Sequence, residues 1–381
     1  MSAGSRDGPR ILHLHSTFAA GGKELRSVRL INAVGPKVEH AIVSAEPERM
    51  EAAQQILRQI PVTYPRNFPS LRGWPTPARL QRLGRAMQGY DLVLTYNWGA
   101  MDAVMAHTAF KDAFGLPPLI HHEDGFNEDE QARLKPARNL YRKIALGRAN
   151  GLVVPSETLE AIALEVWDQP LGRVKHIANG IDTKAFARKP RPDALRGMIK
   201  RKGEFWVGTV AGLRKVKNLP RLVSVFAKLP DEWHLVIVGE GPEREAIRAA
   251  AEHHDIGHRV HLPGFVADPA RYVGLFDIFA ISSDSEQAPL SLIEAMAAGL
   301  PVAAMDVGDV AQMVAEPGRR FVHPSAEKLS EGLRALAANA DLRSELGRAN
   351  REKARDRFDE KPMIAAYRRL YASAMGRDTL P

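Results

Sequence analysis

The chain has 381 residues, of which 45% are hydrophobic and 26% are charged, and it contains no cysteine. This length favours two domains and this composition is that of a globular protein, while the lack of cysteine excludes disulfides, thiolate zinc sites and a cysteine nucleophile. The formal net charge of +8 favours anionic partners such as phosphates or an acidic membrane face. No apolar run is long enough for a signal peptide or a membrane span, so we expect a cytoplasmic protein.

In the first half of the chain, short apolar runs alternate with longer amphipathic stretches, which predicts an α/β fold with parallel sheets. The polar, basic and proline-bearing stretch at 179–204 is the expected linker to a second domain. Helices are expected at Lys23–Ala33 and Pro136–Arg148. The expected strands are Ile11–His15, His40–Ser44, Val62–Tyr64, Asp91–Thr95, Leu119–His122, Gly151–Pro155 and Val174–Ile177.

Basic residues are concentrated in two stretches of this half. Each stretch is either a solvated helix face or a surface that meets anionic lipid, with Phe68, Leu71 and Trp74 as shallow apolar anchors. Nucleic acid is not expected, because neither stretch interleaves stacking aromatic residues. The two stretches comprise Arg66, Arg72, Arg79, Arg82 and Arg85, and then Arg133, Lys135, Arg138, Arg142, Lys143 and Arg148.

A second series of alternating elements follows the linker. Two such series predict two Rossmann-like domains that face one another, with ligands bound in the cleft at the carboxyl ends of the strands. The apolar spacing of Lys361–Met375 predicts a final helix that packs across one of the domains. The expected strands are Trp206–Ala211, His234–Val238, Arg259–Leu262, Ile278–Ser282, Val302–Met305 and Arg320–Val322, and the expected helices are Pro220–Lys228, Glu243–His253, Ser291–Ala298 and Ala326–Ala338.

The most informative stretch runs from Ile278 to Met305. A strand, a polar loop and a helix that begins near Leu290 would aim unpaired backbone N–H groups at a ligand, and a diphosphate would be stabilised there. Two carboxylates flank this helix start, Glu286 in the loop and Glu294 one turn into the helix. They suit the paired hydroxyls of a sugar or ribose. The alternative interpretation makes Glu286 a partner of the helix dipole and Glu294 a surface helix residue.

The spacing Glu286-x7-Glu294, followed by Ala-Met-Ala-Ala-Gly-Leu-Pro-Val at 295–302, resembles the signature of retaining GT-B glycosyltransferases, in particular glycosyltransferase family 4. The resemblance implies that Glu286 contacts the hydroxyls of the donor sugar and that Glu294 contacts the ribose. The backbone amides of Leu290 and Ser291 would then meet the diphosphate. The glycine that the family usually has after the first glutamate is Gln287 here.

Other segments resemble the same family in the same order. Val207–Asn218 is similar to the first strand and loop of the family's second domain, where Lys217 takes the position of a lysine that neutralises the diphosphate. The family's arginine is Gly212 here, and Arg214 or Lys215 could supply that charge. The glycine turn at 238–242 and the backbone of Phe265 and Val266, which would flank the nucleotide base, also fit the resemblance.

On the N-terminal side, Gly21 and Gly22 follow the first strand at the start of a helix. In the family this loop contacts the donor phosphate or the acceptor, and a helix-start turn without a ligand explains the two glycines equally well. The resemblance places a second catalytic landmark after Leu119–His122. Relatives often have a histidine at the position of Asp124, and here either Asp124 or His122 could orient the acceptor hydroxyl or accept its proton. The alternation of His13 and His15 with leucines suits sheet packing better than a metal pair.

The resemblance implies a GT-B fold with an acceptor-side domain at 1–182, a nucleotide-sugar domain at 183–355 and a helix at 356–381 that returns to the first domain. It implies a retaining transfer to a lipid-linked or glycan acceptor, front-face attack, and no need for a metal or other cofactor. Peripheral contact with the inner face of the membrane is expected. The alternatives are a non-catalytic sugar-nucleotide or membrane-surface binding protein and a sugar-nucleotide epimerase or phosphorylase of the same shape.

Overall fold

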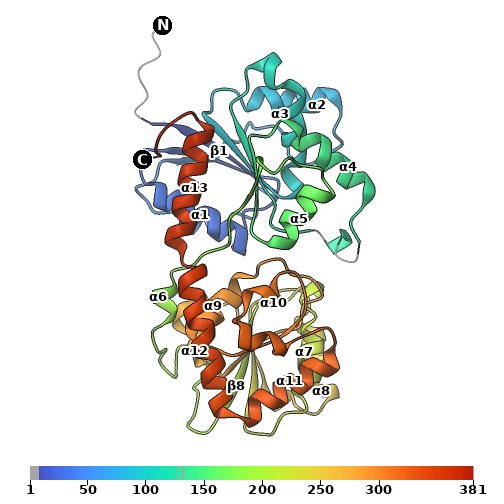
Figure 1. Cartoon of the computed structure of the whole chain (residues 1–381), viewed down its shortest axis with the longest axis vertical. Coiled ribbons are helices and arrows are strands. Elements are labelled where there is room, and N and C mark those ends of the chain that lie inside the picture. The colour runs from blue at the N-terminus through green and yellow to red at the C-terminus, as the bar shows by residue number, and fades with distance from the viewer. Residues whose placement is uncertain (1–7, 127, 131–132, 381) are drawn as a thin grey trace. The chain divides into compact units, whose positions relative to one another are not determined.

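The computed structural model describes residues 8–126, 128–130 and 133–380 (Figure 1). The chain divides into two compact units. Unit 1 comprises Met1–Ala178 together with Pro362–Pro381, and unit 2 comprises Asn179–Lys361. The C-terminal segment therefore belongs to the unit in which the chain begins.

Unit 1 is built on a sheet of seven parallel strands in the order β3-β2-β1-β4-β5-β6-β7. Short apolar runs form these strands because both faces of the sheet are covered by helices. The strands are β1 (Arg10–His15), β2 (Glu39–Ser44), β3 (Val62–Thr63), β4 (Leu92–Tyr96), β5 (Leu119–His122), β6 (Gly151–Val154) and β7 (Val174–His176), and the helices are α1 (Gly22–Val34), α2 (Pro77–Ala86), α3 (Met101–Phe114), α4 (Pro136–Ala145), α5 (Glu157–Glu165) and α13 (Glu360–Ala374).

Alternate residues of β1 pack into different cores of unit 1. Leu12 and Leu14 belong to the core that α2, α3 and α5 share, whereas Ile11 belongs to the core formed with α1 and α13. His13 and His15 are buried and alternate with these leucines, so they point to the side covered by α1 and α13. The returning helix thus covers a sheet face that carries buried histidines among its apolar residues.

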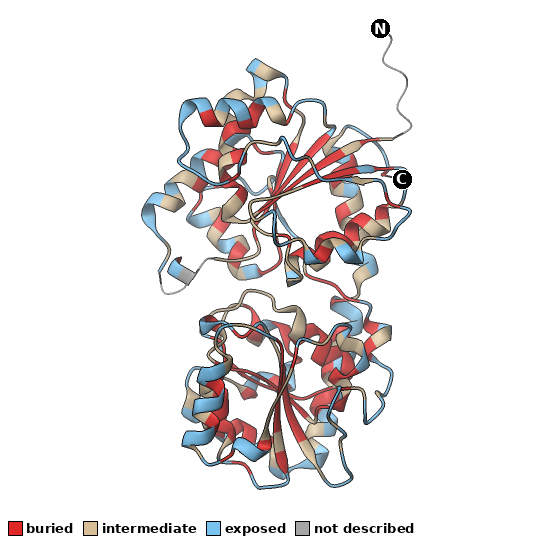
Figure 2. Ribbon diagram, turned by 180° about the vertical axis from the view of Figure 1, so that it is seen from behind, coloured by how far each residue is buried: buried red, intermediate tan, exposed pale blue. Residues whose placement is uncertain are grey.

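Unit 2 has a second parallel sheet, of six strands in the order β10-β9-β8-β11-β12-β13. Its central strands are largely buried, its edge strands are mostly half-buried, and helices lie on both faces of the sheet (Figure 2). The prediction of two Rossmann-like parallel sheets is confirmed. The strands are β8 (Phe205–Val210), β9 (Trp233–Val238), β10 (Val260–Gly264), β11 (Ile278–Ile281), β12 (Val302–Met305) and β13 (Val322–His323), and the helices are α6 (Thr183–Phe186), α7 (Leu219–Phe226), α8 (Arg244–His253), α9 (Leu290–Ala298), α10 (Val310–Met313), α11 (Ala326–Ala338) and α12 (Ala340–Arg357).

Three details of unit 2 differ from the sequence predictions. Residues 316–321 form a 3₁₀ helix that includes Pro317, so the last strand begins only at Val322. The sequence pattern does not predict α12, because this helix is charged along most of its length, and Asn339 caps it by accepting a hydrogen bond from the amide of Leu342. The stretch predicted to be a linker is part of unit 2, where it forms α6 and where Ile181 pairs with Asp359.

Candidate active site

Lys217 and Glu286 meet in unit 2, although 69 positions separate them in the sequence. The Oε1 atom of Glu286 accepts a hydrogen bond of 2.5 Å from Lys217 Nζ and one of 2.7 Å from Ser283 Oγ. Both side chains are shielded from solvent, with 16% of Lys217 and 12% of Glu286 exposed. Two of the residues singled out in the sequence therefore form one charged pair at the end of β11.

Backbone contacts hold the Lys217 loop and the Glu286 loop together. The hydroxyl of Ser282 donates to the carbonyl of Lys217 at 2.9 Å, and the amide of Asp284 donates to the carbonyl of Val216 at 2.8 Å. Lys217 lies at the end of a short 3₁₀ helix (Lys215–Lys217) that follows β8. The pair is thus placed by two neighbouring strands of one sheet.

A turn after β12 supports the Glu286 loop from its other side. The amide of Asp309 donates to the carbonyl of Gln287 at 3.0 Å. Gly308 has a φ of 53°, and a Cβ atom at this position would lie 2.2 Å from the carbonyl oxygen of Glu286. Sequence reasoning missed Gly308 and Asp309, for which the only signal was a Gly-Asp pair just after an apolar strand.

The helix start that was predicted to bind diphosphate is α9. It follows Pro289, and no side chain caps its first turn. Because the first N–H groups of a helix have no intrahelical acceptors, the amides of Leu290 and Ser291 lie where an anion would be stabilised. Glu294 is only 7% exposed, so its interpretation as a surface helix residue is wrong.

Glu294 lies close to the segment expected at the nucleotide base. Burial raises the pKa of Tyr272 above its usual range, and the charges of Glu294 and Asp268 raise it further. The Tyr272 hydroxyl donates to the carbonyl of Val266 at 3.4 Å, and the neighbouring Phe265 is 62% exposed. An open aromatic ring and a buried carboxylate therefore belong to one small region of unit 2.

The glycine turn after β9 joins this region to the loop of Arg214. The amide of Gly239 donates to the carbonyl of Gly264 at 2.9 Å, and the amide of Leu213 donates to the carbonyl of Glu240 at 2.9 Å. A Cβ atom on Gly239, whose φ is +150°, would lie 1.9 Å from the carbonyl oxygen of Ala211. The glycine is needed because two backbones approach each other closely here.

In unit 1, Asp124 is paired with an arginine that the sequence analysis did not identify. Arg26, on α1, binds both carboxylate oxygens of Asp124, with distances of 2.5 and 2.9 Å. Arg26 is buried and also lies over the ring of Tyr367 from α13. Asp124 keeps 12% of its side chain exposed, and its amide is bound by the side chain of Asn97 at 2.9 Å.

His122 is buried and tied to the C-terminal helix. Its Nε2 atom is 2.9 Å from the hydroxyl of Tyr371, and its Nδ1 atom is 3.2 Å from the carbonyl oxygen of Thr95. Burial lowers the pKa of His122 well below its usual range, with a further contribution from the charge of Arg26. The geometry leaves Asp124 as the more accessible of the two predicted acceptor-side residues.

Gly21 and Gly22 lie at the start of α1, as expected, and no side chain caps that helix. The buried carboxylate of Glu24 occupies the space beside them, because a Cβ atom on Gly21 would lie 2.6 Å from its Oε2 atom. Lys23 is ion-paired with Glu24. This helix start is therefore already in contact with a carboxylate, unlike the start of α9.

Two family descriptions match the chain. Residues 193–353 match Glycosyl transferases group 1, and residues 20–185 match Glycosyltransferase Family 4. The chain belongs to glycosyltransferase family 4. Its two Rossmann-like sheets are those of the GT-B glycosyltransferases.

Relatives of this family 4 glycosyltransferase act on several kinds of molecule, as their names show. It is 28% identical over 262 residues to the GDP-mannose-dependent alpha-mannosyltransferase of Mycobacterium tuberculosis. This alignment covers 64% of this chain and 63% of that protein. It is 24% identical over 214 residues to the N-acetyl-alpha-D-glucosaminyl L-malate synthase of Bacillus anthracis, with 55% and 56% covered. The match thus spans less than two thirds of either relative.

The fold of the chain matches that of HepE from Anabaena, whose crystal structure was solved in complex with UDP. The TM-score is 0.77 at 18% sequence identity, and the match covers 96% of this chain and 100% of HepE. At this level of identity the comparison establishes the fold alone.

One departure from the family pattern has a structural counterpart. Where the family has an arginine, this family 4 glycosyltransferase has Gly212, and the Nε atom of Arg214 lies 3.7 Å from where a Cβ atom of Gly212 would be. Arg214 is exposed. The guanidinium group of Arg214 therefore lies next to the Cβ position of the family's arginine.

The second basic stretch is largely an ion-pair network rather than a free basic surface. Arg142 is fully buried and binds both carboxylate oxygens of Glu130, at 3.0 and 2.8 Å. Burial raises the pKa of Glu130, but hydrogen bonds from Arg142 and Arg138 outweigh this effect and lower it to about 2. Lys135 and Arg138 both bind Asp129.

The first basic stretch is more open, with two exceptions. Arg79 is buried and paired with Asp102, and Leu71 is buried in the core of unit 1, so the prediction that Leu71 is a surface anchor is wrong. Trp74 is 87% exposed. Arg66 and Arg82 are exposed as well. Within the described residues, no helix has the length and apolar character needed to cross a bilayer.

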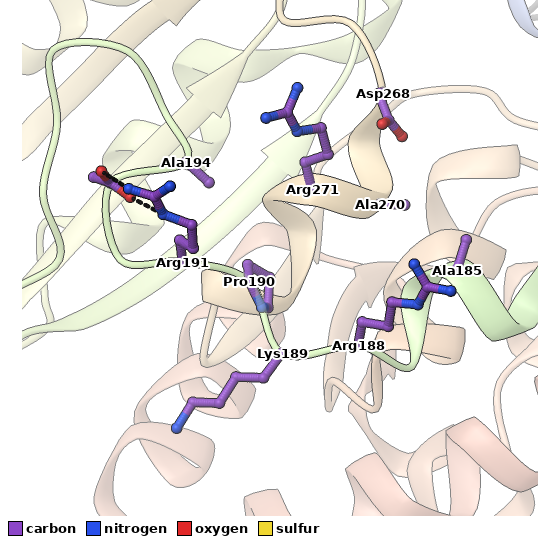
Figure 3. Close-up of a pocket in the computed structure, with 10 residues that line it drawn as sticks. Ala185, Arg188, Lys189, Pro190, Arg191, Ala194, Asp268, Ala270 and Arg271 are labelled. Atoms are coloured by element: carbon purple, nitrogen blue, oxygen red, sulfur yellow. Dashed lines mark hydrogen bonds and ion pairs between the residues drawn. The ribbon is translucent and has the colours of Figure 1, made fainter.

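A cavity of about 430 Å³ lies elsewhere in unit 2, beside α6. It is lined by Arg188, Lys189, Arg191 and Arg271, but these cations point in different directions and Arg191 is paired with Asp193 (Figure 3). None of the predicted site residues lines it. In the part of the chain that the structure describes, no three His, Asp or Glu side chains are grouped as metal ligands.

Proposed function

We propose that this family 4 glycosyltransferase moves a sugar from a nucleotide-diphosphate sugar to a lipid-linked or glycan acceptor in cell-envelope synthesis, with retention of the anomeric configuration. The observation that carries the proposal is the pair between Lys217, in the loop after β8, and Glu286, in the loop that leads to the uncapped start of α9. The buried Glu294 one turn further on completes a set of polar groups suited to a nucleotide sugar. HepE, which shares the fold, was crystallised with UDP.

On the donor side, the amides of Leu290 and Ser291 and the ammonium group of Lys217 bind the diphosphate. Lys217 exchanges the carboxylate of Glu286 for a phosphate oxygen when the donor binds, which frees Glu286 to accept hydrogen bonds from the sugar hydroxyls. Arg214 adds a second positive charge near the phosphates. Glu294 binds the ribose hydroxyls, and the backbone of Phe265 and Val266 flanks the base.

In the chemical step, the bond between the sugar's anomeric carbon and the diphosphate oxygen breaks as the acceptor oxygen attacks from the same face. The acceptor's proton passes to the departing diphosphate. Asp124 orients the acceptor hydroxyl, and its pair with Arg26 fixes the carboxylate in place. The helix dipole of α9 and Lys217 stabilise the leaving group, so the reaction needs no metal ion.

The acceptor is proposed to reach the enzyme at the inner face of the membrane. The open part of the first basic stretch, with Arg66 and Arg82 exposed and Trp74 as an apolar anchor, suits an anionic lipid surface. The ion-paired second stretch does not share this role.

A panel of UDP-, GDP-, ADP- and dTDP-sugars tests the proposal. One donor should raise the melting temperature by mass action, and the enzyme should hydrolyse it slowly without acceptor. The Glu286→Gln variant should bind the same nucleotide but hydrolyse its sugar more slowly. Binding without any hydrolysis or transfer would favour a non-catalytic binding protein, and release of an epimerised sugar would favour an epimerase.

A further inference from the structure

The residue that follows β4, Asn97, has a strained backbone. Its φ is 56° and its ψ is −175°, a combination close to the region that only glycine adopts readily. A glycine would adopt this conformation without strain, so the asparagine side chain is what distinguishes the position. Asn97 is half-buried and lies beside the loop that carries Asp124. Such strain persists only where the surrounding structure holds it, and it is concentrated at functional sites.

The side chain of Asn97 takes the place of a main-chain carbonyl in the sheet. Strands β4 and β5 pair in parallel up to Tyr96 and His122. One step further along this ladder, the amide of Asp124 would donate to the main-chain carbonyl of Asn97. It donates instead to the side-chain Oδ1 atom at 2.9 Å, while the amide of Asn97 still donates to the carbonyl of His122 at 2.8 Å.

This exchange of carbonyls lets the chain turn out of the sheet while the Asp124 loop stays attached to it. The main-chain carbonyl of Asn97 accepts a hydrogen bond from the amide of Ala100 at 3.1 Å, which closes the short 3₁₀ helix Trp98–Ala100. Arg26 holds the carboxylate of Asp124. The loop is therefore fixed at the main chain of Asp124 by Asn97 and at its side chain by Arg26.

The nitrogen end of the Asn97 side chain is available as a donor. Because the main-chain N–H of Asp124 can only donate, the atom that faces it is the oxygen, and Nδ2 lies on the other branch of the same planar amide. Nδ2 has no hydrogen-bond partner among the residues that the structure describes, and it is not enclosed by protein. Asn97 therefore presents an NH₂ group next to the main chain of Asp124.

An NH₂ group and a carboxylate that lie close together are complementary to a hydroxyl group. A hydroxyl donates one hydrogen bond and accepts others, whereas Nδ2 donates and the carboxylate of Asp124 accepts. Arg26 occupies one acceptor position on each carboxylate oxygen, and each oxygen can accept a further bond. An alcohol oxygen that accepts one hydrogen bond from Nδ2 keeps its second lone pair for attack on a sugar.

We propose that Asn97 is a second acceptor-binding residue, which positions Asp124 through Oδ1 and binds the acceptor hydroxyl through Nδ2. This role depends on the proposed function, in which Asp124 orients that hydroxyl. It gives unit 1 a matched donor and acceptor for an alcohol, whether the attacking hydroxyl belongs to water, to a glycan or to a lipid-linked sugar.

Two variants separate the two ends of the Asn97 amide. Asn97→Gly adopts the same backbone conformation but lacks both atoms, whereas Asn97→Asp keeps an oxygen for the amide of Asp124 and lacks the NH₂ group. The donors are UDP-, GDP-, ADP- and dTDP-glucose, with water as the acceptor. Both variants should hydrolyse the donor that the wild type uses roughly tenfold more slowly, the scale of one lost hydrogen bond, with unchanged nucleotide affinity in calorimetry. Hydrolysis at the wild-type rate by Asn97→Asp would show that Nδ2 does not touch the acceptor.

Hydrogen exchange of the Asp124 amide tests the positioning role without a donor. This amide should be protected in the wild type and in Asn97→Asp, and it should exchange much faster in Asn97→Gly. The matched control is Asp168→Gly, which alters an exposed residue of unit 1 whose φ is also positive, 53°, and should change neither hydrolysis nor this exchange. Protection that survives in Asn97→Gly overturns the positioning role. If the wild type hydrolyses no donor, the proposed function fails, while exchange still decides whether Asn97 positions Asp124.

Discussion

The two units have similar sheets but organise their polar residues differently. In unit 2, Lys217 and Glu286 lie in the loops that follow two neighbouring strands, and the loop of Glu286 leads to the uncapped start of α9. In unit 1, the polar groups near Asp124 are buried between the sheet, α1 and α13, where His122 bonds to Tyr371 and Arg26 bonds to Asp124. The comparison teaches that the first unit buries its polar residues between its sheet and two helices, whereas the second places them in the loops that follow its strands.

The largest expected difference between the units is their response to acid. Burial lowers the pKa values of His40 and His107 in unit 1 to about 4, and those of His13, His15 and His122 fall well below the usual range. Because the folded pKa is depressed, the unfolded chain binds more protons as the pH falls from about 6.5 to about 4, and unit 1 loses stability over that window. Each of His40 and His107 contributes up to about 3 kcal/mol.

Hydrogen-exchange protection factors measured in each unit across this pH window check the prediction. Hydrogen-exchange protection in unit 1 should fall first. In unit 2, histidines whose pKa values are also lowered, such as His234 and His261, are only partly buried. Equal losses in the two units would show that the buried histidines do not control acid stability.

The Arg26→Met variant should have the next largest effect. It leaves the Asp124 carboxylate without its buried partner, which should cost unit 1 about 3–5 kcal/mol of unfolding free energy in urea titrations. The double variant R26M/D124N removes both charges and should recover most of the stability. Turnover should stay low in the double variant. If turnover recovered together with stability, Asp124 would not orient the acceptor.

In unit 2, Lys217→Ala should weaken the binding of a nucleoside diphosphate by about 1.5–3 kcal/mol, the scale of a hydrogen bond to a charged group. Binding of the nucleoside alone should be unchanged, and calorimetry should show that the loss shrinks with added salt. Lys228→Ala alters an exposed lysine just after α7, outside the proposed site, and serves as the control. An equal loss for nucleoside and diphosphate would mean that Lys217 holds the loops rather than phosphate.

Glu294→Gln should weaken donor binding by about 1–3 kcal/mol through the ribose alone. The sharpest readout is the preference for a ribonucleotide over its deoxyribose counterpart, measured by calorimetry, which the variant should lose. A variant that keeps this preference would move the ribose contact to another residue.

The smallest expected effect concerns the two basic stretches of unit 1. Arg66→Ser and Arg82→Ser should each weaken co-sedimentation with anionic vesicles by roughly 1 kcal/mol, with no effect on nucleotide affinity. Lys143→Ser and Arg148→Ser should change little, because both cations are already paired with exposed aspartates. If the wild type binds neither anionic nor neutral vesicles at low salt, the acceptor is a soluble one.

The sequence alone determined the sheets and the donor-side motif, because both depend on residues that are close together in the chain. Glu286, Leu290, Ser291 and Glu294 lie within nine positions on one strand–loop–helix segment, and local periodicity and capping rules are enough to place such a segment. Boundaries of buried strands such as Leu119–His122 and Val302–Met305 were predicted to the residue. The roles of these site residues stay predictions until a donor is bound.

Only the tertiary structure decided which distant residues meet. Nothing in the sequence joins Arg26 to Asp124 across 98 positions, or His122 to Tyr371 across 249, because such pairs depend on how α1 and α13 pack on the sheet. The second basic stretch also needed the tertiary structure, because its composition alone predicts a cationic surface. Glu130 and Arg142 turn part of its charge inward while Leu140 and Ile144 face solvent, and separating this buried pair would be costly because it would leave an uncompensated buried charge.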